Sequence, residues 1–187
     1  MTLAHAVLPQ DQDADEIAAG PASLRAEIRV DEPQWRAVDV IAIAGEALDG
    51  VDKALGRERG VVPSAGATLD LLFADDDTLR RLNSAYRGKD SPTNVLAFPA
   101  EANLDAREEA RSAPAFLGGV VLSYPTMRKE AAERGISMAA HTTHLLVHGS
   151  LHLLGFDHET EADRFVMEAL EIDILARLGI ANPYEGS

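Results

Sequence analysis

The sequence predicts a single α+β domain in which a small mixed β-sheet packs with helices. Its 187 residues match the usual length of one domain, and 46% hydrophobic residues suffice for one sizeable core. Short apolar runs typical of strands are interspersed with longer segments of helical periodicity. The sequence contains no internal repeat and shows no sign of a second domain. The absence of cysteine excludes disulfides, thiolate metal sites and thiol nucleophiles.

Strands are expected at four short apolar runs. Residues 24–30 alternate apolar with charged side chains, which predicts a strand with one buried face. The other three runs are shorter and lie at 68–73, 95–98 and 120–124. Because helices separate several of these strands, we expect parallel and antiparallel pairs in one mixed sheet.

Helices are expected where apolar residues recur at helical spacing, at 34–57, 78–87, 126–134, 137–154 and 161–178. Asp75–Asp77 offers caps and negative charge to the start of the second helix. Thr160 is placed to cap the last helix and Gly179 to end it. We expect the apolar face of that helix to consist of Val166, Leu170, Ile174 and Leu178.

The two ends of the chain are predicted to be tails outside the folded domain. Residues 1–23 hold four acids, no base and no sustained period, which predicts a disordered acidic tail. The domain is expected over 24–180, with a surface excursion at 100–115 and a C-terminal tail at 181–187. Neither a basic leader nor an apolar run of about 20 residues occurs. We therefore expect a cytoplasmic protein with no membrane partner.

Five of the six histidines fall within residues 141–158: His141, His144, His148, His152 and His158. On a helix, residues four apart share a face, so His148 and His152 can offer two nitrogens to one ion. Gly155 can end the helix in a left-handed turn, after which His158 can return as a third ligand. Three histidines and an open position are typical of a catalytic zinc site.

The spacing of His148, His152, Gly155 and His158 is that of the metzincin proteases. The rival triplet His144, His148 and His152 has no turn and spreads over two helical turns. We therefore place His141 and His144 beside the ligands or in the cleft. The protease pattern requires a glutamate at position 149, where this chain has Gly149, which leaves room for a bulky substrate but supplies no base.

A second candidate site is the loop after the second helix. Arg87 and Lys89 flank Gly88, and the loop continues to Asn94 before the next strand. The planar fork of an arginine suits phosphate, so this loop can hold an anion. Together with a metal centre that lacks a protein base, this anion-binding loop indicates that the substrate is an anion.

These two motifs together resemble the YbeY family of bacterial endoribonucleases. The resemblance rests on HLLVHGSLHLLGFDH at residues 144–158, with YRGKD at 86–90 and PTNVL at 92–96 upstream. It implies an α+β fold with a zincin-like histidine helix against a small mixed sheet. It also implies one Zn²⁺ bound by His148, His152 and His158. The functional arginine of the family matches Arg87, which with His148 is our candidate for catalysis.

The implied activity is metal-dependent cleavage of single-stranded RNA in late maturation of the 16S rRNA 3′ end and in 70S ribosome quality control. The implied partners are the small subunit or the 70S ribosome, and no DNA is expected. In our hypothesis zinc activates water, Arg87 stabilises transition-state charge and Lys89 steers the RNA. Asp157 is open to two interpretations, as a partner of a ligating histidine or as a turn residue.

Two positions depart from the family pattern. This chain has Gly119 where many family members have aspartate, and Ala97 where they often have serine. Two alternatives stay open, a zinc metalloprotease or amidohydrolase and a non-catalytic ribosome-assembly factor with a fold-stabilising zinc. The net charge of −14 excludes indiscriminate coating of RNA. Residues 75–140, however, hold ten acids and nine bases, so local capture of RNA at a metal–arginine site is compatible with that charge.

Overall fold

The computed structural model describes residues 17–59, 61–63, 65–100 and 114–185. Five strands form one mixed sheet in the order β1-β2-β3-β5-β4. The central strands β2, β3 and β5 are parallel, whereas β1 and β4 run antiparallel along the two edges. The strands are β1 Ile17–Ala19, β2 Leu24–Val30, β3 Ala67–Ala74, β4 Val95–Pro99 and β5 Ala115–Ser123. This arrangement confirms the predicted α+β fold with a small mixed sheet.

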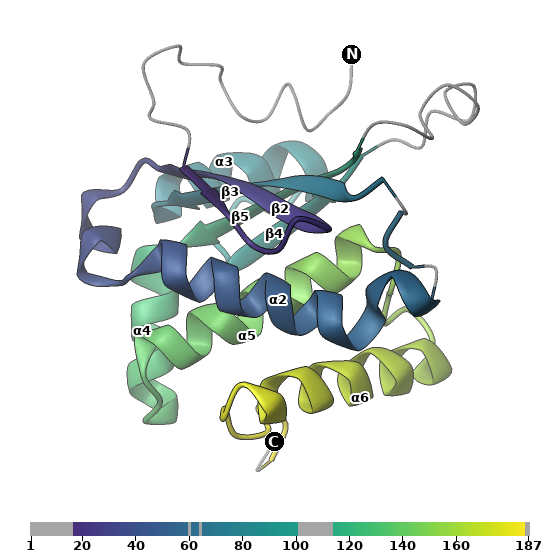
Figure 1. Ribbon diagram of the computed structural model, residues 1–187. Helices are drawn as coiled ribbons and strands as arrows, with labels where there is room; N and C mark the ends of the chain where they lie inside the picture. The colour runs from purple at the N-terminus through teal and green to yellow at the C-terminus, as the bar shows by residue number, and fades with distance from the viewer. Residues whose placement is uncertain (1–16, 60, 64, 101–113, 186–187) are drawn as a thin grey trace.

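The helices form layers on both faces of the sheet, as Figure 1 shows. Helices α2 and α5 cover one face, with α6 packed outside them, and α3 covers the other face. Helix α4 contacts both α3 and α5 at one end of the molecule. The helices are the short 3₁₀ helix η1 Pro33–Ala37, α2 Val40–Arg59, α3 Asp76–Arg87, α4 Tyr124–Arg134, α5 Met138–Leu153 and α6 Glu161–Arg177.

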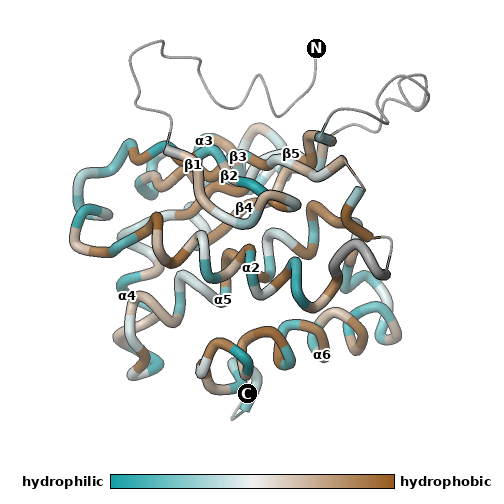
Figure 2. Tube along the Cα trace, in the orientation of Figure 1, coloured by the Kyte–Doolittle hydropathy of each residue, from teal (hydrophilic) through white to brown (hydrophobic). Residues whose placement is uncertain are grey.

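The core divides into two apolar clusters on either side of the sheet. The larger lies between the sheet and the layer of α2, α5 and α6, and the smaller packs Leu79 of α3 against Leu72, Leu96 and Val121. Apolar and polar residues alternate along α2 in Figure 2, as expected of a helix with one buried face. Among the described helices, none combines the length and apolar character needed to span a bilayer.

The predicted tails are wrong at their inner ends. Residues 17–19 form β1, which pairs antiparallel with Ala26–Ile28 of β2, although 1–16 lie outside the described residues. Three residues are too few to show the alternation of apolar and polar side chains that identifies a strand. Strand β1 is recognised only by its pairing with β2. At the other end, Tyr184 lies in the supposed C-terminal tail but donates its hydroxyl to Glu171 of α6. The folded domain therefore extends over 17–185.

The predicted helix 34–57 is interrupted after Ala37. Trp35 in the short helix η1 is completely buried, and its indole N–H donates to the carbonyl of Ala74 at 3.1 Å. The carboxylate of Asp39 accepts a hydrogen bond from the backbone N–H of Ala42 and so caps the N-terminus of α2. Because of this break, Trp35 packs against the sheet, and α2 starts separately at Val40.

Strand β5 is longer than the predicted 120–124, because it begins at Ala115 and ends before Tyr124. The missed part contains Gly118, whose φ of 122° is in the left-handed region, beside a register shift against β3. A glycine-containing bulge has no apolar alternation to recognise. Gly119, the departure from the family pattern, lies opposite Asp70 of β3 and Phe98 of β4. Most of the predicted excursion 100–115 lies outside the described residues.

Candidate metal centre

Helix α5 carries two of the three candidate ligands and ends in a turn that returns the third. Ser137 caps its start by accepting the N–H of Ala140. After Leu153, Gly155 adopts a φ of 89°, and Phe156 donates its backbone N–H to the carbonyl of Leu151 at 3.0 Å. This left-handed turn reverses the chain as predicted. His158 therefore lies beside the helix that it follows.

The structure brings His148, His152 and His158 together. One ring nitrogen from each lies within 4.8 Å of the other two. The Nε2 atoms of His148 and His152 are 3.2 Å apart, and the ring of His158 stacks on that of His148 with centroids 5.8 Å apart. Nitrogens converging in this way fit a transition-metal ion such as zinc.

The outer nitrogens of two rings are held by hydrogen bonds. His148 Nδ1 lies 2.7 Å from Oε1 of Glu171, and His152 Nδ1 lies 3.1 Å from the carbonyl oxygen of Phe156. Both partners accept, so each ring donates from Nδ1 and directs the lone pair of Nε2 toward the shared point. The donor set therefore fits a metal ion without a change of tautomer.

Burial and neighbouring histidines favour the neutral form of one candidate ligand, His152. Burial, together with neighbouring His148 and His158, lowers the pKa of His152. The neutral imidazole that a metal requires is therefore favoured at neutral pH. His148 and His152 are partly buried, whereas His158 is exposed, so the centre opens to solvent on one side. An open side is typical of catalytic rather than structural metal sites.

Glu171 was not foreseen from the sequence and is completely buried on α6. Its carboxylate accepts from His148 and from the Tyr184 hydroxyl, and lies 3.4 Å from Nε2 of His144. Burial alone raises the pKa of Glu171, but hydrogen bonds from His144, His148 and Tyr184 bring it down to about 2. Burial and the bond to Glu171 in turn raise the pKa of Tyr184. Glu171 therefore stays charged at neutral pH and links α6 to His148 of α5.

The predicted apolar face of α6 is partly wrong, which is why Glu171 was missed. Val166 is 49% exposed, and the buried stripe runs instead through Met167, Glu171, Ile174 and Leu175. A carboxylate in an otherwise apolar stripe is a signal in its own right, because a buried charge requires partners. That signal could have identified Glu171 once the face was correctly assigned.

Arg87 lies outside the histidine cluster. Arg87 is the last residue of α3, on the opposite face of the sheet from α5, and is exposed. Gly88 ends the helix with a φ of 67°. In the described ranges Arg87 forms no hydrogen bond or ion pair with the three histidines. Asp90 in the same loop pairs with Arg80, through contacts of 2.6 and 2.8 Å.

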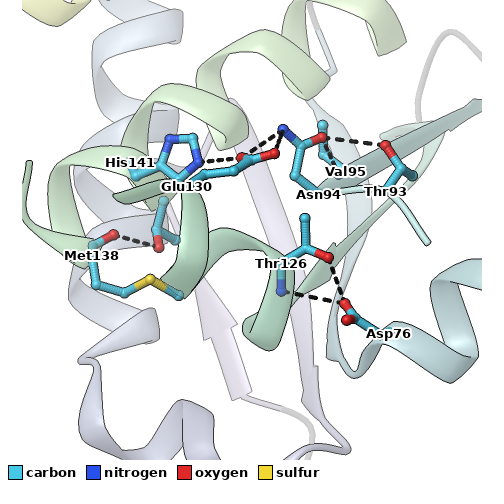
Figure 3. Close-up of polar contacts among 9 residues, drawn as sticks. Asp76, Thr93, Asn94, Val95, Thr126, Glu130, Met138 and His141 are labelled. Carbon is cyan, nitrogen blue, oxygen red and sulfur yellow. Dashed lines mark hydrogen bonds and ion pairs between the residues drawn. The ribbon is translucent and has the colours of Figure 1, made fainter. Parts of the chain in front are cut away.

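A carboxylate on α4 connects the end of this loop with the histidine helix (Figure 3). Glu130 accepts from Asn94 Nδ2 at 3.0 Å and from His141 Nε2 at 2.7 Å. At the other side of α4, Asp76 at the start of α3 accepts the hydroxyl of Thr126 at 2.7 Å. Helix α4 therefore fixes the loop and α3 relative to α5.

Asp157 acts as a turn residue, since its carboxylate accepts the backbone N–H of His158 at 2.6 Å. Of its two interpretations the structure supports this one, because Glu171 is the acid that bonds to a candidate ligand. His144 contacts the same carboxylate and His141 lies a turn earlier, so both are close to the ligands as expected.

Gly149 does not open space for a substrate, which corrects the expectation from the sequence. It faces the sheet, where a Cβ atom would lie 2.8 Å from Cγ1 of the buried Val120. The glycine therefore permits close packing of α5 on β5. No carboxylate occupies the position of the protease general base.

Gly149→Ala is expected to lower the free energy of unfolding by up to about 2 kcal/mol. The gain of about 1 kcal/mol in helix propensity is outweighed by the overpacking cost against Val120 of about 1–3 kcal/mol. Denaturant unfolding measures the difference, and Val120→Ala in the same chain should recover part of it. A stabilised Gly149→Ala protein would show that the helix does not depend on this close approach.

Fold and site together define an α+β protein in which three histidines, two on α5 and one after the turn that follows it, could hold a metal ion at an open site. The family model described as Endoribonuclease YbeY matches residues 30–179. A relative of that name from Dinoroseobacter shibae is 44% identical over 175 residues, covering 88% of this chain and 93% of the relative. One from Rhodopseudomonas palustris strain CGA009 is 42% identical, covering 86% and 80%. The chain belongs to the endoribonuclease YbeY family.

A solved structure shares the fold. The solution structure of TM1509 from Thermotoga maritima matches with a TM-score of 0.50 at 20% sequence identity. The match covers 87% of this chain and 96% of that one. At this identity the likeness supports the fold alone.

Proposed function

We propose that this chain is a zinc-dependent endoribonuclease that cleaves single-stranded RNA. The observation that carries the proposal is the convergence of three histidine nitrogens on an open site, in a chain whose relatives are named endoribonucleases. Gly149 counts against a metalloprotease, because a glycine supplies no carboxylate at the position of the protease general base. The open side of the centre counts against a purely fold-stabilising zinc.

In this proposal His148, His152 and His158 hold one zinc ion through their inner nitrogens. When bound, zinc supplies Lewis-acid polarisation of a phosphate and acidification of water. The protein's part is to orient the ligands: Glu171 fixes the ring of His148, and the carbonyl of Phe156 fixes that of His152. His148 would contribute to catalysis as a metal ligand whose ring is oriented by the buried carboxylate of Glu171.

Arg87 is proposed to bind the phosphate backbone and to stabilise charge that develops during cleavage, with Lys89 steering the strand. Its guanidinium is exposed and without a hydrogen bond to the described residues, so its donors are open to an oxyanion. Asn94 and Glu130 stabilise the end of its loop against α5. In this proposal one strand of RNA contacts Arg87 and the histidine cluster at separate points.

We further propose that the substrate is the 3′ region of 16S rRNA, cleaved in late maturation and in 70S ribosome quality control in the cytoplasm. The expected partners are the small subunit or the 70S ribosome. The charge distribution supports delivery by a partner, because the acidic excess of the chain disfavours unaided capture of RNA. The near-neutral segment 75–140 is where the RNA is expected to approach.

Arg87→Glu is expected to lower cleavage of a single-stranded RNA by about 10²–10³-fold with unchanged zinc content. The loss follows from replacing a phosphate-binding cation by a repelling anion. Initial cleavage rates and metal analysis of the same preparations measure both quantities. Arg36→Glu makes the same charge change at another exposed arginine and should stay close to wild type. Equal cleavage by wild type and Arg87→Glu would contradict the assigned role.

A further inference from the structure

An exposed tyrosine directly precedes Arg87 and has no role in the cleavage proposed above. Tyr86 is 42% exposed, and its hydroxyl forms no hydrogen bond with any residue that the structure describes. Its ring packs against that of Phe98 on the edge strand β4, with centroids 5.2 Å and planes 66° apart. Phe98 in turn packs against the smaller apolar cluster between α3 and the sheet. The ring of Tyr86 is therefore held in place while a large part of it is accessible to a ligand.

The residues that follow Tyr86 bring two positive charges to the same loop. Arg87 and Lys89 are both exposed, and among the described residues neither side chain forms an ion pair or a hydrogen bond. Arg80, by contrast, is paired with Asp90. An accessible aromatic ring beside two unpaired cations can offer one ligand both a stacking surface and phosphate contacts, which is how proteins bind single-stranded nucleic acids without reading their sequence.

Hydrogen bonds within the loop fix its conformation. Gly88 donates its backbone N–H to the carbonyl of Ser84, and Lys89 donates its own to the carbonyl of Asn83. The side-chain amide of the buried Asn83 donates to the carbonyl of Ser91 at 2.8 Å. A loop held by its own hydrogen bonds loses little conformational freedom when a ligand binds, so its ring and cations can act together at low entropic cost.

Exposure of an aromatic ring is not sufficient for this role, as Phe165 on α6 illustrates. Phe165 is 75% exposed, but the neighbouring Arg164 lies 4.0 Å from the carboxylate of Glu168. Glu161 and Asp163 add negative charge before it. A phosphate backbone is repelled by such surroundings. Phe165 therefore provides a matched control, an exposed ring without unpaired cations beside it.

We propose that Tyr86 is a stacking platform for one base of the single-stranded RNA, while Arg87 and Lys89 bind the phosphates next to that base. The proposal rests on the RNA-cleaving function proposed above and names a further residue that binds its substrate. Every nucleobase has a π face, so the contact with Tyr86 should tolerate any sequence. Bases in duplex RNA are stacked on one another, whereas those of a single strand are free to stack on a protein ring. The same contact therefore favours single-stranded substrates.

The test compares labelled octauridylate with a labelled octamer of abasic ribose, which carries the same phosphates but no bases. Fluorescence anisotropy measures the affinity of zinc-loaded protein for both strands on ice at one salt concentration, and gel electrophoresis verifies that the strands stay intact. We expect wild type to bind octauridylate at least about tenfold tighter than the abasic strand. Tyr86→Leu should lose about tenfold in affinity for octauridylate and keep its affinity for the abasic strand.

Further variants separate stacking from other roles. Tyr86→Trp keeps an aromatic face and should bind octauridylate as tightly as wild type. Lys89→Gln removes a phosphate contact and should weaken the binding of both strands by the same factor. Phe165→Leu removes an exposed ring elsewhere and should change neither affinity. Thermal unfolding verifies that each variant is folded, and Tyr86→Met removes the same ring if the leucine variant does not fold.

Equal affinity of wild type for the two strands would overturn the proposal, and so would unchanged binding of octauridylate by folded Tyr86→Leu. An equal loss for both strands in that variant would also overturn it, because Tyr86 would then act on the loop rather than on a base. Cleavage of single-stranded RNA by the same wild-type preparation distinguishes the two proposals. If RNA is cleaved but Tyr86 does not affect binding, only the stacking role fails. If binding depends on Tyr86 but no RNA is cleaved, only the proposed function fails.

Discussion

His148→Ala is expected to retain no zinc and to lose at least about 10³-fold of the RNA cleavage rate. Its Nε2 is one of three converging ligand atoms, and two histidines alone do not make a stable site. The substitution also removes a hydrogen-bond partner of the buried Glu171, so the variant must be verified as folded. Metal analysis and cleavage of a single-stranded RNA measure the two effects in one preparation.

His141→Phe is the matched control, because it also removes a buried histidine of α5 but none of the proposed ligands. It should bind one zinc ion per chain and keep cleaving RNA. Wild-type cleavage by a folded His148→Ala protein, or the same zinc loss in both variants, would rule out the assignment of the ligands.

Glu171→Gln is expected to weaken zinc binding by about 10–100-fold and to destabilise the fold by about 3 kcal/mol. Glu171 is completely buried and accepts from His148 and Tyr184 beside His144. A neutral amide keeps the shape but loses the charge and turns one acceptor into a donor. Competition with a zinc chelator measures the affinity, and denaturant unfolding measures the stability.

Tyr184→Phe separates the two effects, because it removes one donor to Glu171 and leaves the contact with His148 intact. We expect a loss of about 1 kcal/mol in stability and zinc affinity close to wild type. Unchanged zinc affinity in a folded Glu171→Gln protein would show that this carboxylate does not hold the metal ligand in place.

The convergence of the three candidate ligands could be predicted because their geometry is local. His148 and His152 share a helix face by spacing alone, and Gly155 is the residue that a reversing turn requires. All three ligands lie within eleven consecutive residues, so no tertiary contact had to be foreseen. The same kind of local reasoning located most of the mixed sheet, because four of its strands contain short apolar runs, although the glycine-containing start of β5 was missed.

Features that depend on packing between distant segments could not be predicted in this way. Glu171 lies on another helix, and assigning its partners required knowing which face of α6 meets α5. Strand β1 is defined by its pairing with β2 rather than by its own residues. Gly149 has a packing role that depends on the position of Val120 across the interface. Arg87 could be proposed as a phosphate-binding residue from its loop, but its position at the end of α3 across the sheet could not be foreseen.

The most direct test of a zinc-dependent nuclease at this site is a titration of chelator-treated protein with zinc while RNA cleavage is measured. We predict no cleavage before zinc is added, then a rise in rate that stops at one ion per chain. His148→Ala should show no rise over the same range. Full cleavage by metal-free wild-type protein, or a rate that does not follow zinc occupancy, would contradict the account.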